Sequence, residues 1–140
     1  MQASNNPDIS LILRNTKTIA VVGLSRSPLR PSHTVASYMQ SQGFRIIPVN
    51  PNYRSILGEI CYPDLLKIPV SIRVDMVNVF RRAEAVPAIV EEAIQRGVPG
   101  IWMQEGIIHQ AAAEKAANAG LWVVMDRCLM IEHRYVSRPL

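Results

Sequence analysis

The side chains best suited to chemistry gather in one loop near the start of the chain. An apolar run, Thr18–Val22, ends at Gly23. The polar, basic and proline-containing loop that follows includes Ser25, Arg26, Ser27, Arg30, Pro31 and Ser32, where a helical pattern begins. A strand, a glycine turn and a helix in this order present backbone N–H groups and a helix N-terminus to an anion. Arginine adds a planar fork of donors that matches phosphate. The loop therefore predicts a site for a ligand that carries phosphate.

The same loop keeps only part of the glycine pattern that binds dinucleotides. Of G-x-G-x-x-G, the segment keeps the glycine at Gly23, while Ser25 and Pro28 occupy the second and third glycine positions. The second predicted strand ends in Asn50-Pro51, not in the acidic residue that holds an NAD ribose. An NADP-linked or other nucleotide-dependent enzyme remains an alternative, because arginine can read a 2′-phosphate.

Other candidates for catalysis or metal binding stand alone in the sequence. Cys128 lies at a predicted strand-to-helix junction, a position that suits a reactive thiol, yet its apolar neighbours favour a small buried side chain. Glu105 is the one carboxylate placed for acid–base work. Cys61 and Cys128 lie far apart, and no residue set has metal-ligand spacing. The sequence thus predicts no catalytic residue and no metal site, with a thiol or redox role of Cys128 as an alternative.

Strand and helix patterns alternate along the whole chain. Strands are expected at 18–24, 44–49, 74–80, 100–104 and 121–125, and helices at 8–15, 32–42, 83–96, 110–118 and from about 126 onward. Repeated βα units produce a parallel sheet with helices on both faces. The sequence therefore predicts a single α/β domain over residues 1–140, with a Rossmann-like core at about 15–135. This core is a doubly wound, three-layer, five-stranded parallel sheet with the strand order 3-2-1-4-5.

The carboxyl ends of parallel strands meet at one edge of a sheet, where ligands bind. In this chain these ends carry much of the unusual polar chemistry: the loop after Gly23, Asn50 to Tyr53, Phe80-Arg81-Arg82, Gln104-Glu105-Gly106 and Asp126-Arg127-Cys128. We expect them to form one shared crevice. At least one of Arg26, Arg30 and Arg81 is expected to bind phosphate, and the sequence does not decide between Arg26 and Arg30.

Composition limits the class of partner. The 140 residues include 15 basic and 11 acidic side chains, for a formal net charge of +4, but the basic residues are scattered and only 6% of residues are aromatic. This pattern argues against a nucleic-acid platform. No apolar run approaches the roughly 18 residues of a membrane span, and no signal peptide is visible. We expect a cytoplasmic protein without membrane contact, and a protein partner or a homo-oligomer stays open.

Six motifs, taken in order, resemble a known family. They are Ala20–Gly23 with its Ser/Arg/Pro loop, Pro48–Pro51, Gly58-Glu59, Asp75–Arg81, Trp102–Gly106 and Asp126–Met130. Together they look like the small bacterial CoA-binding protein family, which is similar to the N-terminal CoA-binding domain of the succinyl-CoA synthetase alpha subunit. The resemblance covers the chain from about Asn15 to Tyr135.

The resemblance implies a Rossmann-like domain that binds coenzyme A or an acyl-CoA at the strand ends. By the family pattern, residues from Gly23 to Ser27 and Arg30 approach the phosphates, Asn50, Pro51 and Tyr53 line the nucleotide, Val79, Phe80 and Arg81 flank it, and Gln104, Glu105 and Gly106 close the site. The synthetase carries its active-site phosphohistidine in a separate, later domain, for which 140 residues leave no room. The expectation is therefore a binding protein without synthetase activity, and the acyl group is not specified.

Overall fold

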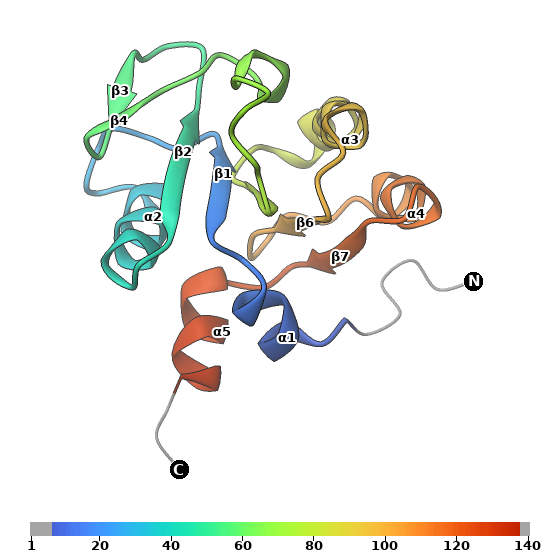
Figure 1. Cartoon of the computed structure of the whole chain (residues 1–140). Coiled ribbons are helices and arrows are strands. Elements are labelled where there is room, and N and C mark those ends of the chain that lie inside the picture. The colour runs from blue at the N-terminus through green and yellow to red at the C-terminus, as the bar shows by residue number, and fades with distance from the viewer. Residues whose placement is uncertain (1–6, 138–140) are drawn as a thin grey trace.

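A five-stranded parallel sheet lies between two layers of helices (Figure 1), in a computed structural model that describes residues 7–137. The strands of the sheet are β1 (Thr18–Val22), β2 (Arg45–Val49), β5 (Met76–Val79), β6 (Gly100–Met103) and β7 (Trp122–Met125). The helices are α1 (Ile9–Arg14), α2 (Pro31–Ser41), α3 (Val86–Arg96), α4 (Gln110–Asn118) and α5 (Leu129–Val136), with short 3-10 turns at η1 (Leu65–Lys67) and η2 (Ala83–Ala85). The predicted α/β class with its doubly wound sheet and three layers is confirmed.

Each face of the sheet has its own apolar core, because parallel strands are buried on both sides. On one face, strand residues such as Val77 and Ile101 pack against Val90 of α3 and against α4. On the other face, Trp102 packs in a cluster with Met39 of α2 and with residues of α1 and α5. The two helical layers hold the strands rigidly, so the loops at the strand ends start from fixed points.

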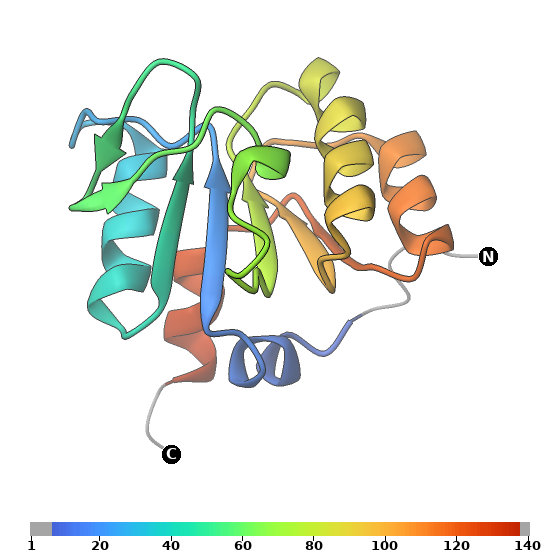
Figure 2. The same ribbon diagram turned by 45° about the horizontal axis from the view of Figure 1, so that its top comes forward.

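The predicted strand order is wrong in one respect. The observed order is β2-β1-β5-β6-β7, so the third main strand lies beside β1 and not outside β2. Pro48 gives the physical reason: proline has no N–H for a ladder bond, which confines it to edge strands. The free side of β2 is instead closed by Tyr62, whose N–H donates to the Pro48 carbonyl at 3.0 Å. Blue β1 and green β2 run side by side in the same direction (Figure 2).

The connection from β2 to β5 contains a small element that the sequence patterns did not predict. Strands β3 (Ser55–Ile56) and β4 (Glu59–Ile60) form an antiparallel hairpin beside α2 and β2 (Figure 1). Arg96 of α3 then holds the rest of the connection, donating to the carbonyl oxygens of Leu65, Ile68, Pro69 and Ile72. The crossover over β1 is therefore fixed by the guanidinium of one half-buried arginine and not by an α-helix.

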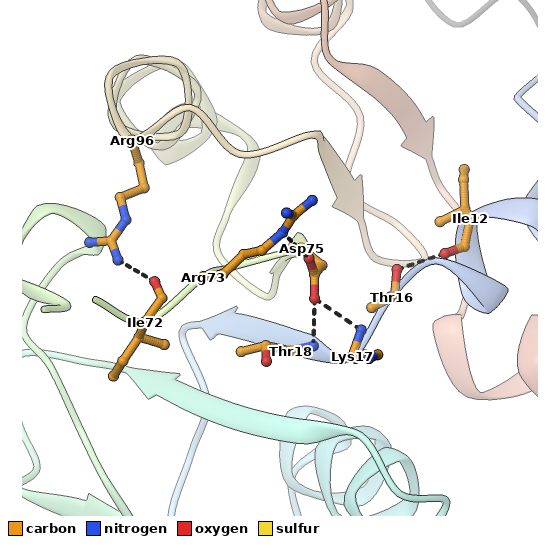
Figure 3. Close-up of polar contacts among 8 residues, drawn as sticks. All are labelled: Ile12, Thr16, Lys17, Thr18, Ile72, Arg73, Asp75 and Arg96. Carbon is orange, nitrogen blue, oxygen red and sulfur yellow. Dashed lines mark hydrogen bonds and ion pairs between the residues drawn. The ribbon is translucent and has the colours of Figure 1, made fainter. Parts of the chain in front are cut away.

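A single carboxylate joins β1 to β5 at the amino ends of these strands. Asp75 is 8% exposed, and its Oδ2 accepts the N–H groups of Lys17 and Thr18, both at 3.0 Å (Figure 3). Its Oδ1 accepts from Arg73 Nε at 2.9 Å. These hydrogen bonds tie the chain before β1 to the start of β5 at the amino ends of the two strands.

Candidate functional site

Two adjoining hollows open at the carboxyl ends of the strands. The wide hollow, about 550 Å³, lies over β5 and β6 and is lined by Pro31, Phe80, Arg81, Arg82, Ala83, Glu84, Gln104, Glu105, Gly106 and Ile107. The narrow hollow, about 220 Å³, lies over β1 and β2 and is lined by Val22, Val49, Pro51, Pro63, Asp64, Arg81, Ala85, Ala88, Ile89 and Glu92. Arg81 belongs to both walls. Parts of four predicted strand ends therefore meet at one edge of the sheet, in two compartments joined at Arg81. The end of β7, residues 126–128, was expected in the same crevice but lines neither compartment.

Gly23 brings the ends of β1, β2 and β5 together. Its N–H donates to the Val49 carbonyl at 2.8 Å, and its φ of +90° lies in the region that favours glycine. A β-carbon at this position would collide with the carbonyl oxygen of Phe80 and lie 2.9 Å from Cδ of Arg81. The absence of a side chain at Gly23 is what lets the Arg81 stem lie over the end of β1.

The serines of the first loop are occupied with the loop itself. Ser32 Oγ accepts the N–H of Ser25 at 3.0 Å, Ser25 Oγ accepts the N–H of Ser27 at 3.0 Å, and Ser27 Oγ accepts the N–H of Leu29 at 3.3 Å. These three amides already have acceptors and are not offered to an anion. The hydroxyl groups act here as turn formers that deliver the chain to the start of α2 in a fixed shape.

Arg26 and Asn50 connect the first loop to the end of β2. The guanidinium carbon of Arg26 lies 5.8 Å from the centre of the Tyr53 ring, within the range of a cation–π contact. Asn50 donates from Nδ2 to the Leu24 carbonyl at 3.0 Å and accepts the N–H of Asn52 at 2.9 Å. Arg30 is exposed at the N-cap of α2 and makes no side-chain cap bond. Arg26 and Arg30, the two candidate phosphate ligands of the loop, are thus both exposed, and Arg26 is restrained by Tyr53.

The side chains at the ends of β5 and β6 differ in their exposure to solvent. Val79 is 0% exposed and belongs to the core, so it positions Phe80 and Arg81 and does not line either hollow. Gln104 is 6% exposed and lines the wide hollow, and Glu105 is exposed beside it. Gly106 is held by its N–H, which donates to Oδ1 of Asp126 at 2.7 Å.

Several lining residues were not assigned to the site from the sequence. Arg82, Ala83 and Glu84 follow Arg81 directly and form the start of η2, so the rule that strand ends line the crevice could have been extended by one turn. Glu92 lies two turns into α3 and lines the narrow hollow because its Oε1 accepts the N–H of Leu65 at 3.1 Å. That contact depends on the path of the crossover, for which the sequence carries no local signal.

The cysteines lie outside both hollows. Cys128 is the half-buried N-cap of α5, and it packs beside the core under α2 and α5. Cys61 is buried, and its thiol donates to the Asn50 carbonyl at 3.4 Å. Burial raises the pKa of the Cys61 thiol above its ordinary value.

Within residues 7–137, no group of three or more His, Cys, Asp or Glu side chains is arranged to hold a metal ion. Over the same part of the chain, no helix has the length and apolar character to cross a membrane.

Comparison with known families identifies the family of the chain. Residues 17–134 match the model of a family described as the CoA binding domain. The chain belongs to this family. The family resemblance expected from the six sequence motifs is thereby confirmed.

Relatives of this CoA-binding domain are small proteins and parts of larger enzymes. The chain is 41% identical over 133 residues to the uncharacterized protein YneT of Bacillus subtilis, covering 95% of this chain and 97% of that protein. A solved structure of a hypothetical protein from Pyrococcus horikoshii superposes with a TM-score of 0.90 at 36% identity, over 97% of this chain and 96% of that one. The chain is also 34% identical over 123 residues to an ADP-forming acetate–CoA ligase of Archaeoglobus fulgidus, covering 81% of this chain but 18% of the enzyme.

Proposed function

We propose that this protein binds coenzyme A or an acyl-CoA across the two hollows and carries out no reaction of its own. The observation that carries the proposal is the position of Arg81 in the wall of both hollows. Coenzyme A has its diphosphate in the middle, between an adenine nucleotide and a long pantetheine arm. The guanidinium of Arg81, between the two hollows, can bind the diphosphate while the adenine nucleotide and the pantetheine arm occupy one hollow each.

The narrow hollow suits the adenine end of the ligand. Val49 and Ile89 supply apolar walls, and Asp64 and Glu92 supply carboxylate oxygens that can accept from an amino group. The two carboxylates would repel a phosphate. Adenine, which carries an amino group and no charge, is therefore the better occupant.

The wide hollow suits the pantetheine arm. Its lining includes the apolar side chains of Pro31, Phe80 and Ile107, and its volume is within the range of pockets that hold drug-sized ligands. The diphosphate would then lie between the hollows, near Arg81 and the N-terminus of α2, where the field of the helix favours an anion.

Binding without a reaction is supported by the lining of the hollows. The residues around them include no cysteine, serine or histidine that could pair as nucleophile and base. Glu84 and Glu105 on the wide hollow are both exposed, which favours solvated carboxylates over acid–base catalysts.

A thermal-shift panel of coenzyme A, acetyl-CoA, dephospho-CoA, NAD and NADP tests the proposal. A ligand present at 100 times its Kd adds about 2.7 kcal/mol to the free energy of unfolding. We expect coenzyme A to raise the melting temperature more than NAD or NADP does. A larger shift with NADP would favour the nucleotide-dependent enzyme, and no shift with millimolar coenzyme A would refute the proposal.

Replacing Arg81 tests the position of the diphosphate. Arg81→Ala should weaken coenzyme A binding by about ten- to a hundredfold, because a charge-assisted hydrogen bond contributes roughly 1.5–3 kcal/mol. Arg45→Ala is the matched control, since Arg45 is an exposed arginine at the amino end of β2, on the opposite edge of the sheet. Equal losses in both variants would show a general effect of net charge.

A further inference from the structure

Asp126 is the first residue after β7, and its backbone has an unusual conformation. Its φ of +63° lies in the left-handed region that L side chains rarely adopt, although aspartate tolerates this region better than most residues do. Within residues 7–137, Leu57 in the turn between β3 and β4 is the only other residue besides glycine with a positive φ. A strained backbone persists only where its surroundings stabilise it. The contacts of Asp126 must therefore favour this conformation over a relaxed one.

The end of β6 holds the backbone at Asp126. Strands β6 and β7 are parallel neighbours (Figure 1), and the N–H groups of Asp126 and Arg127 both donate to the Met103 carbonyl, at 2.9 and 3.4 Å. The Arg127 carbonyl in turn accepts the indole N–H of Trp102 at 2.8 Å, and Trp102 is fully buried. Three hydrogen bonds to β6 therefore fix the direction in which the Asp126 side chain leaves the backbone.

The Asp126 side chain reaches the turn that follows β6. Its Oδ1 accepts the N–H of Gly106 at 2.7 Å, a distance typical of a charge-assisted hydrogen bond. The other bond of this turn joins the Ile107 N–H to the Gln104 carbonyl at 2.9 Å. Gly106 has a φ of +85° and no side chain, so its backbone has more conformational freedom than that of its neighbours. Asp126 therefore restrains the residue of the turn that has the most freedom.

Asp126 lies outside the surface that would contact a ligand. It lines neither hollow, whereas Gly106 and Ile107 line the wide hollow. Any effect of Asp126 on a ligand must therefore pass through the turn. A wall that is already ordered loses less conformational entropy on binding than a wall that the ligand has to order.

We propose that Asp126 is a positioning residue that holds the turn after β6 in its binding conformation from outside the wide hollow. This inference rests on the proposed function, because the wide hollow is where the pantetheine arm would lie. The end of β7 thus contributes to binding indirectly, and the positive φ of Asp126 is what directs its carboxylate at Gly106.

Two substitutions separate the hydrogen bond from the charge and from the backbone strain. Asp126→Gly removes the acceptor, and glycine adopts a positive φ without strain. Asp126→Asn is the matched control, because it removes the charge but keeps an oxygen for the Gly106 N–H. Asparagine also tolerates the left-handed region, so the backbone at position 126 is preserved.

Hydrogen exchange at the Gly106 amide tests the contact without any ligand. Exchange should be about tenfold or more faster in Asp126→Gly than in the wild type, because the amide loses its acceptor. In Asp126→Asn the increase should be about threefold or less, because a neutral hydrogen bond keeps roughly half the strength of a charge-assisted one. The melting temperature of Asp126→Gly should stay close to that of the wild type, since relief of the strained φ offsets the lost bond.

Calorimetry with coenzyme A and with adenosine 3′,5′-bisphosphate, which lacks the pantetheine arm, tests the effect on binding. Asp126→Gly should weaken coenzyme A binding by about tenfold, because the ligand must then order the turn. Asp126→Asn should weaken it by about threefold or less. Neither variant should change the affinity for the bisphosphate by more than about twofold, because that ligand does not reach the turn.

Four results would overturn the inference. Unchanged coenzyme A binding in Asp126→Gly would show that the turn needs no restraint from Asp126. Equal losses in Asp126→Gly and Asp126→Asn would assign the effect to the charge, and equal losses for both ligands would assign it to a general disturbance of the site. These three results leave the proposed function standing. Failure of the wild-type protein to bind coenzyme A would refute the proposed function itself, and the inference with it.

Discussion

The carbonyl oxygen of Phe80 occupies the space that a β-carbon on Gly23 would need. The two residues terminate neighbouring strands, and the N–H of Phe80 donates to the Val22 carbonyl at 2.8 Å. This close approach holds the start of the first loop against the start of the Arg81 segment. The geometry of the candidate site and the stability of the sheet thus depend on the same missing side chain.

Gly23→Ala should therefore lower the free energy of unfolding by about 2–4 kcal/mol, the combined effect of a strained backbone and an overpacked contact. Urea denaturation measures this loss. Gly43→Ala is the control, because Gly43 also has a positive φ, +97°, but a β-carbon there would meet no atom within 4 Å. That variant should lose only about 1 kcal/mol. Equal losses would show that the Phe80 contact does not matter.

Arg26 is the arginine that we expect to read the 3′-phosphate of coenzyme A. It is restrained over Tyr53, which follows the end of β2, and in doubly wound sheets the ribose lies near the end of the second strand. Arg26→Ala should remove most of the preference for coenzyme A over dephospho-CoA, a change of about tenfold or more in the ratio of the two affinities. Competition binding with the two ligands measures this ratio.

Arg30→Ala is the comparison for that experiment. Arg30 is the N-cap of α2 and has no cation–π contact with an aromatic ring among the described residues. Removal of the Arg30 side chain should weaken the binding of coenzyme A and of dephospho-CoA to a similar extent. A residue near the diphosphate contacts a group that both ligands contain. If Arg30→Ala removes the preference and Arg26→Ala leaves it intact, the two roles are exchanged.

The strand order marks the limit of what the sequence predicted about the fold. Alternating patterns predicted five parallel strands and their approximate bounds, because apolar runs and glycine stops are local signals. The order of those strands depends on long-range pairing, and two doubly wound orders fit the same pattern. Pro48 was the deciding signal, since a proline within β2 marks an edge strand.

The candidate site was predictable where it depended on strand ends and not where it depended on burial. Phe80, Arg81 and Gln104 line the wide hollow because they end strands or follow them directly. Val79 was assigned with them, but alternation along β5 turns its side chain into the core. The serines were assigned to phosphate; in the structure their oxygens accept N–H groups of the loop, a local geometry that residue types alone do not specify, and their O–H groups stay candidate donors to a phosphate.

Asp75 should be among the most sensitive polar residues for stability. Its carboxylate accepts two backbone N–H groups at the start of β1 and one from Arg73, and it is almost fully buried (Figure 3). Asp75→Ala should lower the free energy of unfolding by about 2–4 kcal/mol, because the amides of Lys17 and Thr18 lose their acceptor. Chemical denaturation measures the effect.

Arg73→Ala separates the backbone contacts from the ion pair. The Arg73 side chain is 84% exposed, so its pairing with Asp75 is screened by solvent and should contribute less than about 1 kcal/mol. A loss in Arg73→Ala as large as that in Asp75→Ala would show that the ion pair, and not the two amides, is the main contribution.

His133 makes the packing of α5 sensitive to pH. His133 is half-buried, with Nδ1 at 2.7 Å from the Tyr38 hydroxyl and its ring 5.5 Å from that of Phe44. Burial lowers the pKa of His133 below its ordinary value of 6.5. As the pH falls through 6.5, the unfolded chain takes up this proton before the folded protein does, so stability is lost down to the folded-state pKa and then levels off.

Denaturation of wild type and His133→Gln between about pH 7.5 and 5 tests this prediction. The wild type should lose more stability than the variant over this interval, because only the wild type carries the titrating ring at this position. His33→Gln controls for the loss of a histidine on α2 and should follow the wild type. A constant difference between wild type and His133→Gln across the interval would contradict the assigned role of burial.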